Sequence, residues 1–198
     1  MTAAKAIHRA YTQAESLVVV ASPSERQSGE WMLKAERLLG TLGVKIKGDG
    51  VNRLSLTLPN GSRIVGLPGR DDKIRGLSKV SLLLIDEAAQ VTESLYKSLM
   101  PMLAVSNGDM WLLSTPWGKR GFFYETWQYG GDRWFRVSVP ATECQRIPKE
   151  FLEEQRGAMG PGWFRQEYMC EFTDNGTSVF DRDLVEAALD DFLEPLEA

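Results

Sequence analysis

An aliphatic run at residues 80–85, followed at once by Asp86 and Glu87, constrains the fold more than any other stretch. The run is too short for a membrane span and too evenly apolar for a strand with one wet face, so it predicts a strand buried on both faces, as in parallel sheets. Open α/β sheets bind ligands at the carboxyl edge of their strands. We therefore expect ligand chemistry where Asp86 and Glu87 lie.

Two neighbouring carboxylates at that edge point to opposite sides of the strand. One can hold a metal ion through water while the other orients an attacking water molecule. The alternative interpretation is that Asp86 and Glu87 only end the strand and begin a helix, because a helix amino terminus favours negative charge.

Strands and helices alternate along most of the rest of the chain. Apolar runs at 17–21 and 110–114 predict two more buried strands, and the alternating segment 134–139 predicts a strand towards the sheet edge. Alternating runs at 53–58 and 62–67, around a Pro-Asn-Gly turn, predict a hairpin. Helices are expected at residues 2–13, 27–39, 92–103, 122–129, 148–157, 162–170 and 183–192. This order predicts an α/β fold with a three-layer parallel sheet.

The composition narrows the functional classes. The net charge of -4 excludes an overall basic footprint, so any contact with nucleic acid must use a local patch. Cys144 and Cys170 lack metal-ligand spacing and are too few for a disulfide scaffold, which indicates a cytosolic protein with free thiols. No apolar run approaches the ~20 residues of a membrane helix. The amino terminus also lacks the order of a signal peptide, so we expect no membrane and a protein that stays inside its cell.

Three further features have both a plain and a functional interpretation. The basic loop at 67–76 is either a solvated surface or part of a binding site. Aromatic residues between 117 and 134 could stack bases, but residues at such mixed spacing more often pack a core or a hinge. Asp181 and Asp183 are expected to cap the last helix rather than to hold a metal ion.

Four motifs follow one another in a fixed order. Residues 82–89, Leu-Leu-Leu-Ile-Asp-Glu-Ala-Ala, resemble the Walker B motif of additional-strand P-loop ATPases, and residues 112–118, Leu-Leu-Ser-Thr-Pro-Trp-Gly, resemble their sensor or coupling motif. Ile-Arg-Gly stands at 74–76, and Ala-Ser-Pro-Ser-Glu-Arg-Gln-Ser stands at 21–28. Together, over nearly the whole chain, these motifs resemble the motor domain of bacteriophage terminase large subunits, the ATPases that drive double-stranded DNA into a procapsid.

The resemblance implies a P-loop NTPase fold of the RecA-like, additional-strand type, with a site for ATP and Mg²⁺. Asp86 would hold the water shell of Mg²⁺, and Glu87 would polarise the attacking water. Arg75 would be a catalytic arginine near the nucleotide, acting either in its own subunit or across a subunit interface.

Two more groups of residues receive roles from the resemblance. Ser114, Thr115 and Pro116 match the coupling motif, which implies that they lie at the nucleotide, sense its γ-phosphate and pass the loss of that phosphate to the parts that grip DNA. Arg26 and Gln27 match a polar turn of the family, with a contact on either the phosphate side or the DNA side.

The chain departs from the family pattern in one motif. No Gly-x-x-x-x-Gly-Lys-Ser/Thr occurs, although the family carries it just upstream of a helix like the one expected at 2–13. The backbone N–H groups and the lysine that hold phosphates would then be missing, so we expect the fold to lack its first strand and phosphate loop. Residues 1–172 would form this truncated ATPase domain. Residues 173–198 would form a linker and a helix that lead to an absent nuclease domain.

Two hypotheses of different classes follow. In the first, the chain is a fragment of a large terminase subunit of a phage or prophage, found in the cytoplasm of the bacterial host and probing little ATP by itself. Its partners would be double-stranded DNA, the portal protein, the small terminase subunit and further copies in a ring. In the second, it is a non-catalytic remnant that serves as a binding or assembly module for DNA, portal or small terminase subunit. A helicase-like ATPase would need a second motor domain, for which 198 residues leave no room.

Overall fold

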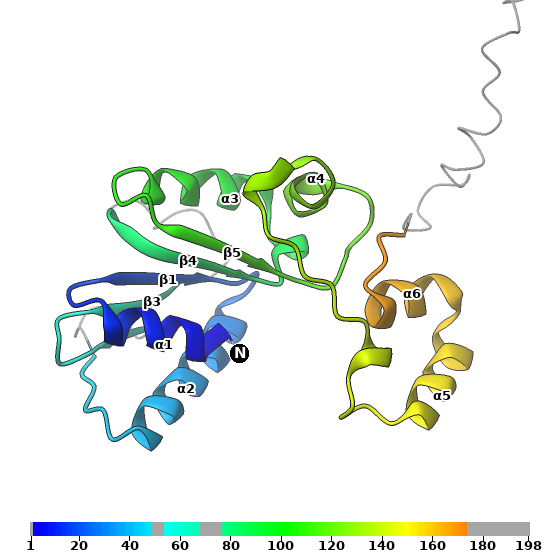
Figure 1. Cartoon of the computed structure of the whole chain (residues 1–198), viewed down its shortest axis with the longest axis horizontal. Coiled ribbons are helices and arrows are strands. Elements are labelled where there is room, and N and C mark those ends of the chain that lie inside the picture. Colours follow the sequence, from blue (N-terminus) through cyan, green and yellow to red (C-terminus); the bar gives the residue numbers. More distant parts are fainter. Residues whose placement is uncertain (1, 49–53, 68–76, 174–198) are drawn as a thin grey trace, which may run out of the picture. The chain divides into compact units, whose positions relative to one another are not determined.

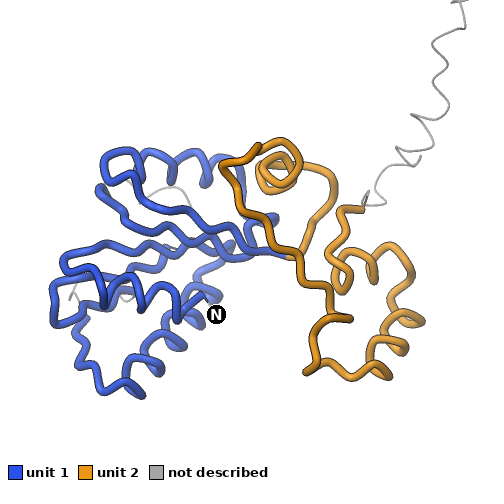
Figure 2. The backbone as a smooth tube through the Cα atoms, in the orientation of Figure 1, with its two compact units in different colours: residues 1–114 blue, residues 115–198 orange. Residues whose placement is uncertain are grey.

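The computed structural model describes residues 2–48, 54–67 and 77–173. Arg75, in the expected basic loop, and the expected helix at 183–192, with Asp181 and Asp183, lie outside the described residues. The chain forms two compact units, unit 1 at residues 1–114 and unit 2 at residues 115–198 (Figure 2).

Unit 1 is built on a five-stranded sheet in the order β2-β3-β1-β4-β5. The strands are β1 (Leu17–Ala21), β2 (Ser55–Thr57), β3 (Arg63–Leu67), β4 (Val80–Asp86) and β5 (Asp109–Leu113). All neighbours run parallel except β2, which returns antiparallel along β3. The predicted parallel sheet and its hairpin are therefore confirmed, and β4 lies between β1 and β5.

Helices cover both faces of this sheet (Figure 1). Helices α1 (Thr2–Thr12) and α2 (Glu25–Thr41) lie on one face, and α3 (Glu93–Leu99) with the 3₁₀ turn η3 (Met100–Leu103) lies on the other. Leu82 and Leu84 of β4 belong to the core under α1 and α2. Leu83 and Ile85 alternate to the opposite face and are also fully buried. A strand covered on both faces needs apolar residues at every position, which explains the run that dominates the sequence.

Two helix boundaries differ from the sequence expectation for local reasons. Helix α2 begins before residue 27 because Ser24 caps it, its Oγ accepting a hydrogen bond from the Gln27 backbone N–H at 3.3 Å. The single helix expected at 92–103 is divided into α3 and η3, since Pro101 has no N–H to continue the helical hydrogen bonds.

Helix α1 is fastened to the amino-terminal ends of two strands. Arg9 donates to the Ser81 carbonyl oxygen at 2.9 Å and forms an ion pair with Asp109. The two contacts hold α1 against the starts of β4 and β5, at the sheet edge opposite to Asp86. No helix among the described residues is long and apolar enough to cross a membrane.

Unit 2 contains the helices α4 (Gly121–Tyr129), α5 (Lys149–Met159) and α6 (Pro161–Met169), with 3₁₀ turns η4 (Gly131–Arg133) and η5 (Ala141–Glu143). The Phe172 ring packs against Phe123, Tyr124 and Trp127, with ring centroids 5.1–6.2 Å apart. These contacts favour the packing interpretation of the aromatic residues over base stacking.

The strand expected at 134–139 is wrong. The segment pairs with no other strand among the described residues, and Phe135 is 92% exposed. Arg136 turns back to the end of α4 and donates to four carbonyl oxygens, those of Thr126, Trp127, Gly131 and Trp134. Alternation of apolar residues permits a strand, but a strand forms only where a neighbour completes its hydrogen-bond ladder.

Candidate functional site

Asp86 and Glu87 lie where β4 ends. Asp86 is the last residue of the strand, and Glu87 adopts the left-handed conformation (φ 51°, ψ 45°) before the 3₁₀ turn η2 (Ala88–Gln90) begins. A residue other than glycine in this region costs about 1–3 kcal/mol of strain, which the surrounding structure must offset. The sharp turn separates the directions of the two carboxylates and carries the chain away from the sheet.

Ser114 meets this turn from the neighbouring strand. The register pairs Asp86 with Leu113, so Ser114 follows directly after the end of β5. Its Oγ accepts a hydrogen bond from the Ala89 backbone N–H at 3.2 Å. The structure thus brings Asp86, Glu87 and Ser114 together at one edge, as parallel strands require.

The other expected site residues are not placed with them. Thr115 is half-buried and Pro116 is buried, and both belong to unit 2. Arg75 lies outside the described residues. Ser22, which follows β1 at the same edge as Asp86, is fully buried, and its Oγ has no hydrogen-bond partner among the described residues.

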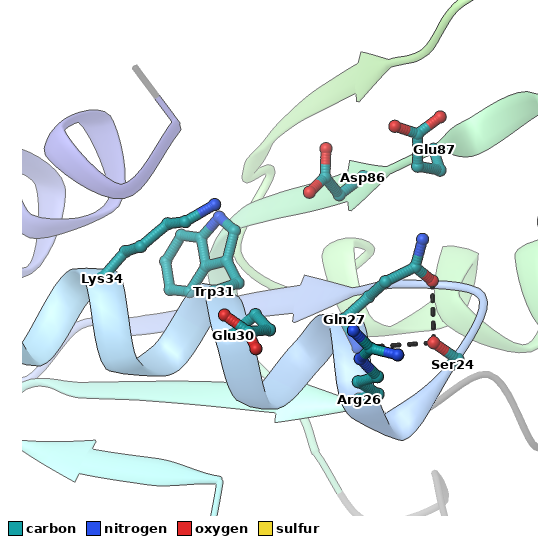
Figure 3. A pocket seen from close by; sticks show the side chains of 8 residues that line it. All are labelled: Ser24, Arg26, Gln27, Glu30, Trp31, Lys34, Asp86 and Glu87. Atoms are coloured by element: carbon teal, nitrogen blue, oxygen red, sulfur yellow. Dashed lines mark hydrogen bonds between the residues drawn. The ribbon is translucent and has the colours of Figure 1, made fainter.

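An open cleft of about 530 Å³ lies between the first half of α2 and the end of β4 (Figure 3). It is lined by Ser24, Arg26, Gln27, Glu30, Trp31, Lys34, Asp86 and Glu87. Figure 3 shows Gln27 and Lys34 extending from α2 toward the strand end that carries Asp86. Sequence reasoning missed Glu30, Trp31 and Lys34. The helical spacing that places residues 26, 30 and 34 on one face could have indicated two of them.

Trp31 fixes the wall of this cleft. Its side chain is 5% exposed, and its Nε1 donates to Thr2 Oγ1 at 3.0 Å. Because Thr2 begins α1, this bond joins the two helices beside the cleft. The wall formed by α2 is therefore anchored in the core of unit 1.

Charges of both signs face the cleft. Burial raises the pKa of the Asp86 carboxyl, and the Glu87 backbone N–H and the charge of Lys34 lower it in part. A carboxylate that has lost water favours a cation beside it, and oxygen ligands are those that Mg²⁺ prefers. Among the described residues no three acidic, histidine or cysteine side chains gather into a metal cluster. This donor set therefore suits an ion that keeps most of its water ligands, as Mg²⁺ does.

The cationic side of the cleft suits phosphate. Arg26 lies in the first turn of α2, where backbone N–H groups and the helix dipole favour an anion. Lys34 adds a second positive charge on the same helix. The carboxylates at the end of β4 and the cations of α2 together fit a phosphate group with its metal ion.

Comparison with known proteins identifies relatives. The family model described as terminase large subunit, T4likevirus-type, N-terminal, matches residues 1–187. The curated large terminase subunits of Thermus phage G20c and Thermus virus P23-45 are each 28% identical to the chain over 130 residues, which cover 56% of this chain and 26% of theirs. The chain thus spans about a quarter of the length of these relatives.

Solved structures show the same fold. The ATPase domain of the Thermus phage P74-26 large terminase superposes with a TM-score of 0.66 at 23% identity, over 87% of this chain and 82% of that one. A large terminase from a thermophilic bacteriophage superposes with a TM-score of 0.72 at 16% identity, over 92% of this chain and 48% of that one. The same phage enzyme was also solved with ADP and with ATP-gamma-S. These likenesses confirm the P-loop NTPase fold.

Proposed function

Since the chain belongs to the family of T4likevirus-type terminase large-subunit N-terminal domains, we propose that unit 1 supplies the carboxylate side of the ATP-hydrolysing site in a motor that packages double-stranded viral DNA. The observation that carries this proposal is the meeting of Asp86, Glu87 and Ser114 at one sheet edge, beside a cleft with two basic side chains. Enzymes that transfer phosphoryl groups rely on positioning and charge stabilisation. Carboxylates facing cations across a cleft can supply both.

Asp86 and Glu87 have separate roles in this proposal. Asp86 would hold Mg²⁺ through its water ligands, since this ion commonly binds through one or two carboxylates and keeps several waters. The bound ion supplies positive charge that neutralises the charge developing on the phosphates. Glu87 would accept a hydrogen bond from the attacking water and orient it. The left-handed turn at Glu87 supports this division because it separates the two carboxylates.

Arg26 and Lys34 would stabilise phosphate charge from the side of α2. The charge of Lys34 already acts on Asp86, and Arg26 stands where the helix dipole favours an anion. This places Arg26 on the phosphate side of the two alternatives that the family motif left open.

The remaining site residues keep the roles implied by the family. Ser114, Thr115 and Pro116 would sense the γ-phosphate and couple its loss to DNA movement. Arg75 would approach the nucleotide in its own or a neighbouring subunit. ADP and ATP-gamma-S in a related large terminase support a nucleotide as the ligand.

The whole motor is a wider proposal, since the chain spans only about a quarter of its curated relatives. Residues 1–172 would form the ATPase domain and residues 173–198 the connection to a nuclease domain. Partners would be double-stranded DNA, the portal protein, the small terminase subunit and further copies in a ring, in the cytoplasm of a bacterial host.

One observation favours a second candidate function. The 198 residues contain no Gly-x-x-x-x-Gly-Lys-Ser/Thr, whose backbone N–H groups and lysine hold the β- and γ-phosphates of ATP. A polypeptide of these residues alone would then bind ATP weakly and serve as a binding or assembly module for DNA, portal or small terminase subunit.

The test compares two polypeptides. One has the 198 residues, and the other adds upstream a terminase strand and phosphate loop that end in Gly-Lys-Ser/Thr. We expect negligible ATP hydrolysis by the first. The second should turn over on the order of 1 per second with Mg²⁺, melt at a higher temperature, and gain further stability from ATP through mass action.

Single substitutions assign the activity to the site. In the extended polypeptide, Glu87→Gln should abolish hydrolysis while ATP still raises the melting temperature. The matched control is Glu36→Gln, on the exposed side of α2, which should leave turnover unchanged. An extended polypeptide that ignores millimolar ATP would favour the binding module, and turnover that survives Glu87→Gln would overturn the assigned site.

A further inference from the structure

Ser114 occupies an unusual capping position. The first N–H groups of a helical turn lack partners within that turn, and the side chain of the N-cap residue normally satisfies one of them. In η2 the N-cap residue is Glu87, and its side chain makes no capping hydrogen bond. The hydroxyl of Ser114 instead accepts the Ala89 N–H at 3.2 Å, from the end of the neighbouring strand β5.

The rest of the turn is held by local bonds. Gln90 N–H donates to the Glu87 carbonyl oxygen at 2.9 Å, and Val91 N–H donates to the Ala88 carbonyl oxygen at 3.2 Å. Neither bond ties the turn to the sheet. The bond from Ala89 to Ser114 does, and it does so two residues after the strained left-handed residue that carries the carboxylate.

We propose that Ser114 is a positioning residue that holds the left-handed turn of Glu87 by capping η2 from β5. The proposal rests on the function proposed above for Glu87. It has two consequences. The Glu87 carboxylate is spared from capping its own turn, and its direction depends on where β5 ends. Ser114 therefore acts on the rate of the chemical step through Glu87, even if its hydroxyl hydrogen also reaches a phosphate.

Hydrogen exchange in the 198-residue chain, without nucleotide, tests the geometry. Ser114→Ala should lower the protection of the Ala89 amide roughly three- to tenfold, the loss expected for one hydrogen bond. The three-bond coupling between the amide and α protons of Glu87 should change as its φ relaxes. Ser114→Thr keeps the acceptor and should restore both signals. Ser98→Ala removes a hydroxyl that bonds only the Leu95 carbonyl oxygen within α3, and should leave both unchanged.

Kinetics of the extended polypeptide separate positioning from phosphate binding. Ser114→Ala should lower kcat with little change in KM for ATP, and Ser114→Thr should recover most of kcat. A raised KM at unchanged kcat would make Ser114 a phosphate contact and would overturn the proposal. Unchanged Ala89 exchange in Ser114→Ala would also overturn it. Loss of Ala89 protection in a chain whose extended form never hydrolyses ATP would support the cap while rejecting the proposed function.

Discussion

Truncation of Leu83 tests whether β4 is the core of unit 1. Leu83 is fully buried, on the face that α3 covers. Replacing a buried leucine by alanine costs about 2–5 kcal/mol, from lost transfer free energy and the cavity left behind. At about 0.05–0.15 kcal/mol per residue, a unit of 114 residues has a stability of about 6–17 kcal/mol. Leu83→Ala should therefore remove a large share of the free energy of unfolding.

Hydrogen exchange followed by mass spectrometry measures this loss for unit 1 separately from unit 2. The expected free-energy change corresponds to a fall in the protection of β1 and β4 amides of roughly 30- to 5,000-fold. The matched control is Leu33→Ala, the same truncation on α2 where the side chain is 50% exposed. It should change protection by less than about threefold, since surface substitutions usually stay within ~0.5 kcal/mol.

Charged substitutions sharpen the test. Leu83→Asp and Ile85→Asp bury an unpaired carboxylate, which adds several kcal/mol to the lost packing, and should unfold unit 1. Asp86→Ala, one residue further on, should spare the fold because Asp86 already lies at the strand end. Equal effects of Leu83→Ala and Leu33→Ala, or a folded Leu83→Asp, would refute the assignment of β4 as a strand buried on both faces.

Two further predictions concern charge. Because burial raises the pKa of Asp86 above its value in the unfolded chain, its ionisation opposes folding; the cost is absent below the unfolded pKa and grows as pH rises towards the folded pKa. Asp86→Asn should therefore raise the melting temperature at neutral pH, and thermal melts at decreasing pH should show this gain shrinking; a gain that grew in acid would contradict the argument. In unit 2, Arg136→Ala should lower the protection of α4 amides by the equivalent of about 1–3 kcal/mol, since it removes four hydrogen bonds to carbonyl oxygens. Arg136→Lys should recover only part of it, and Arg133→Ala, at an exposed position, should have no such effect.

Sequence alone predicted the parallel sheet because its strands are buried on both faces. A segment such as Leu17–Ala21 has apolar residues at every position, and this pattern is compatible with few other environments. The same reasoning identified the edge with Asp86, Glu87 and Ser114, since parallel strands bring their carboxyl ends together. The family resemblance rested on these stretches, and the family match confirms it.

Tertiary structure decided the features that depend on a neighbour. The alternating segment 134–139 is no strand, because Arg136 caps α4 and no other strand in the described part of the chain completes its ladder. The left-handed turn at Glu87 depends on Ser114, and the cleft depends on how α2 packs across the sheet. Burial is a property of each residue type, so sequence can predict it. Hydrogen bonds between distant residues require register and packing, which exist only once the chain has folded.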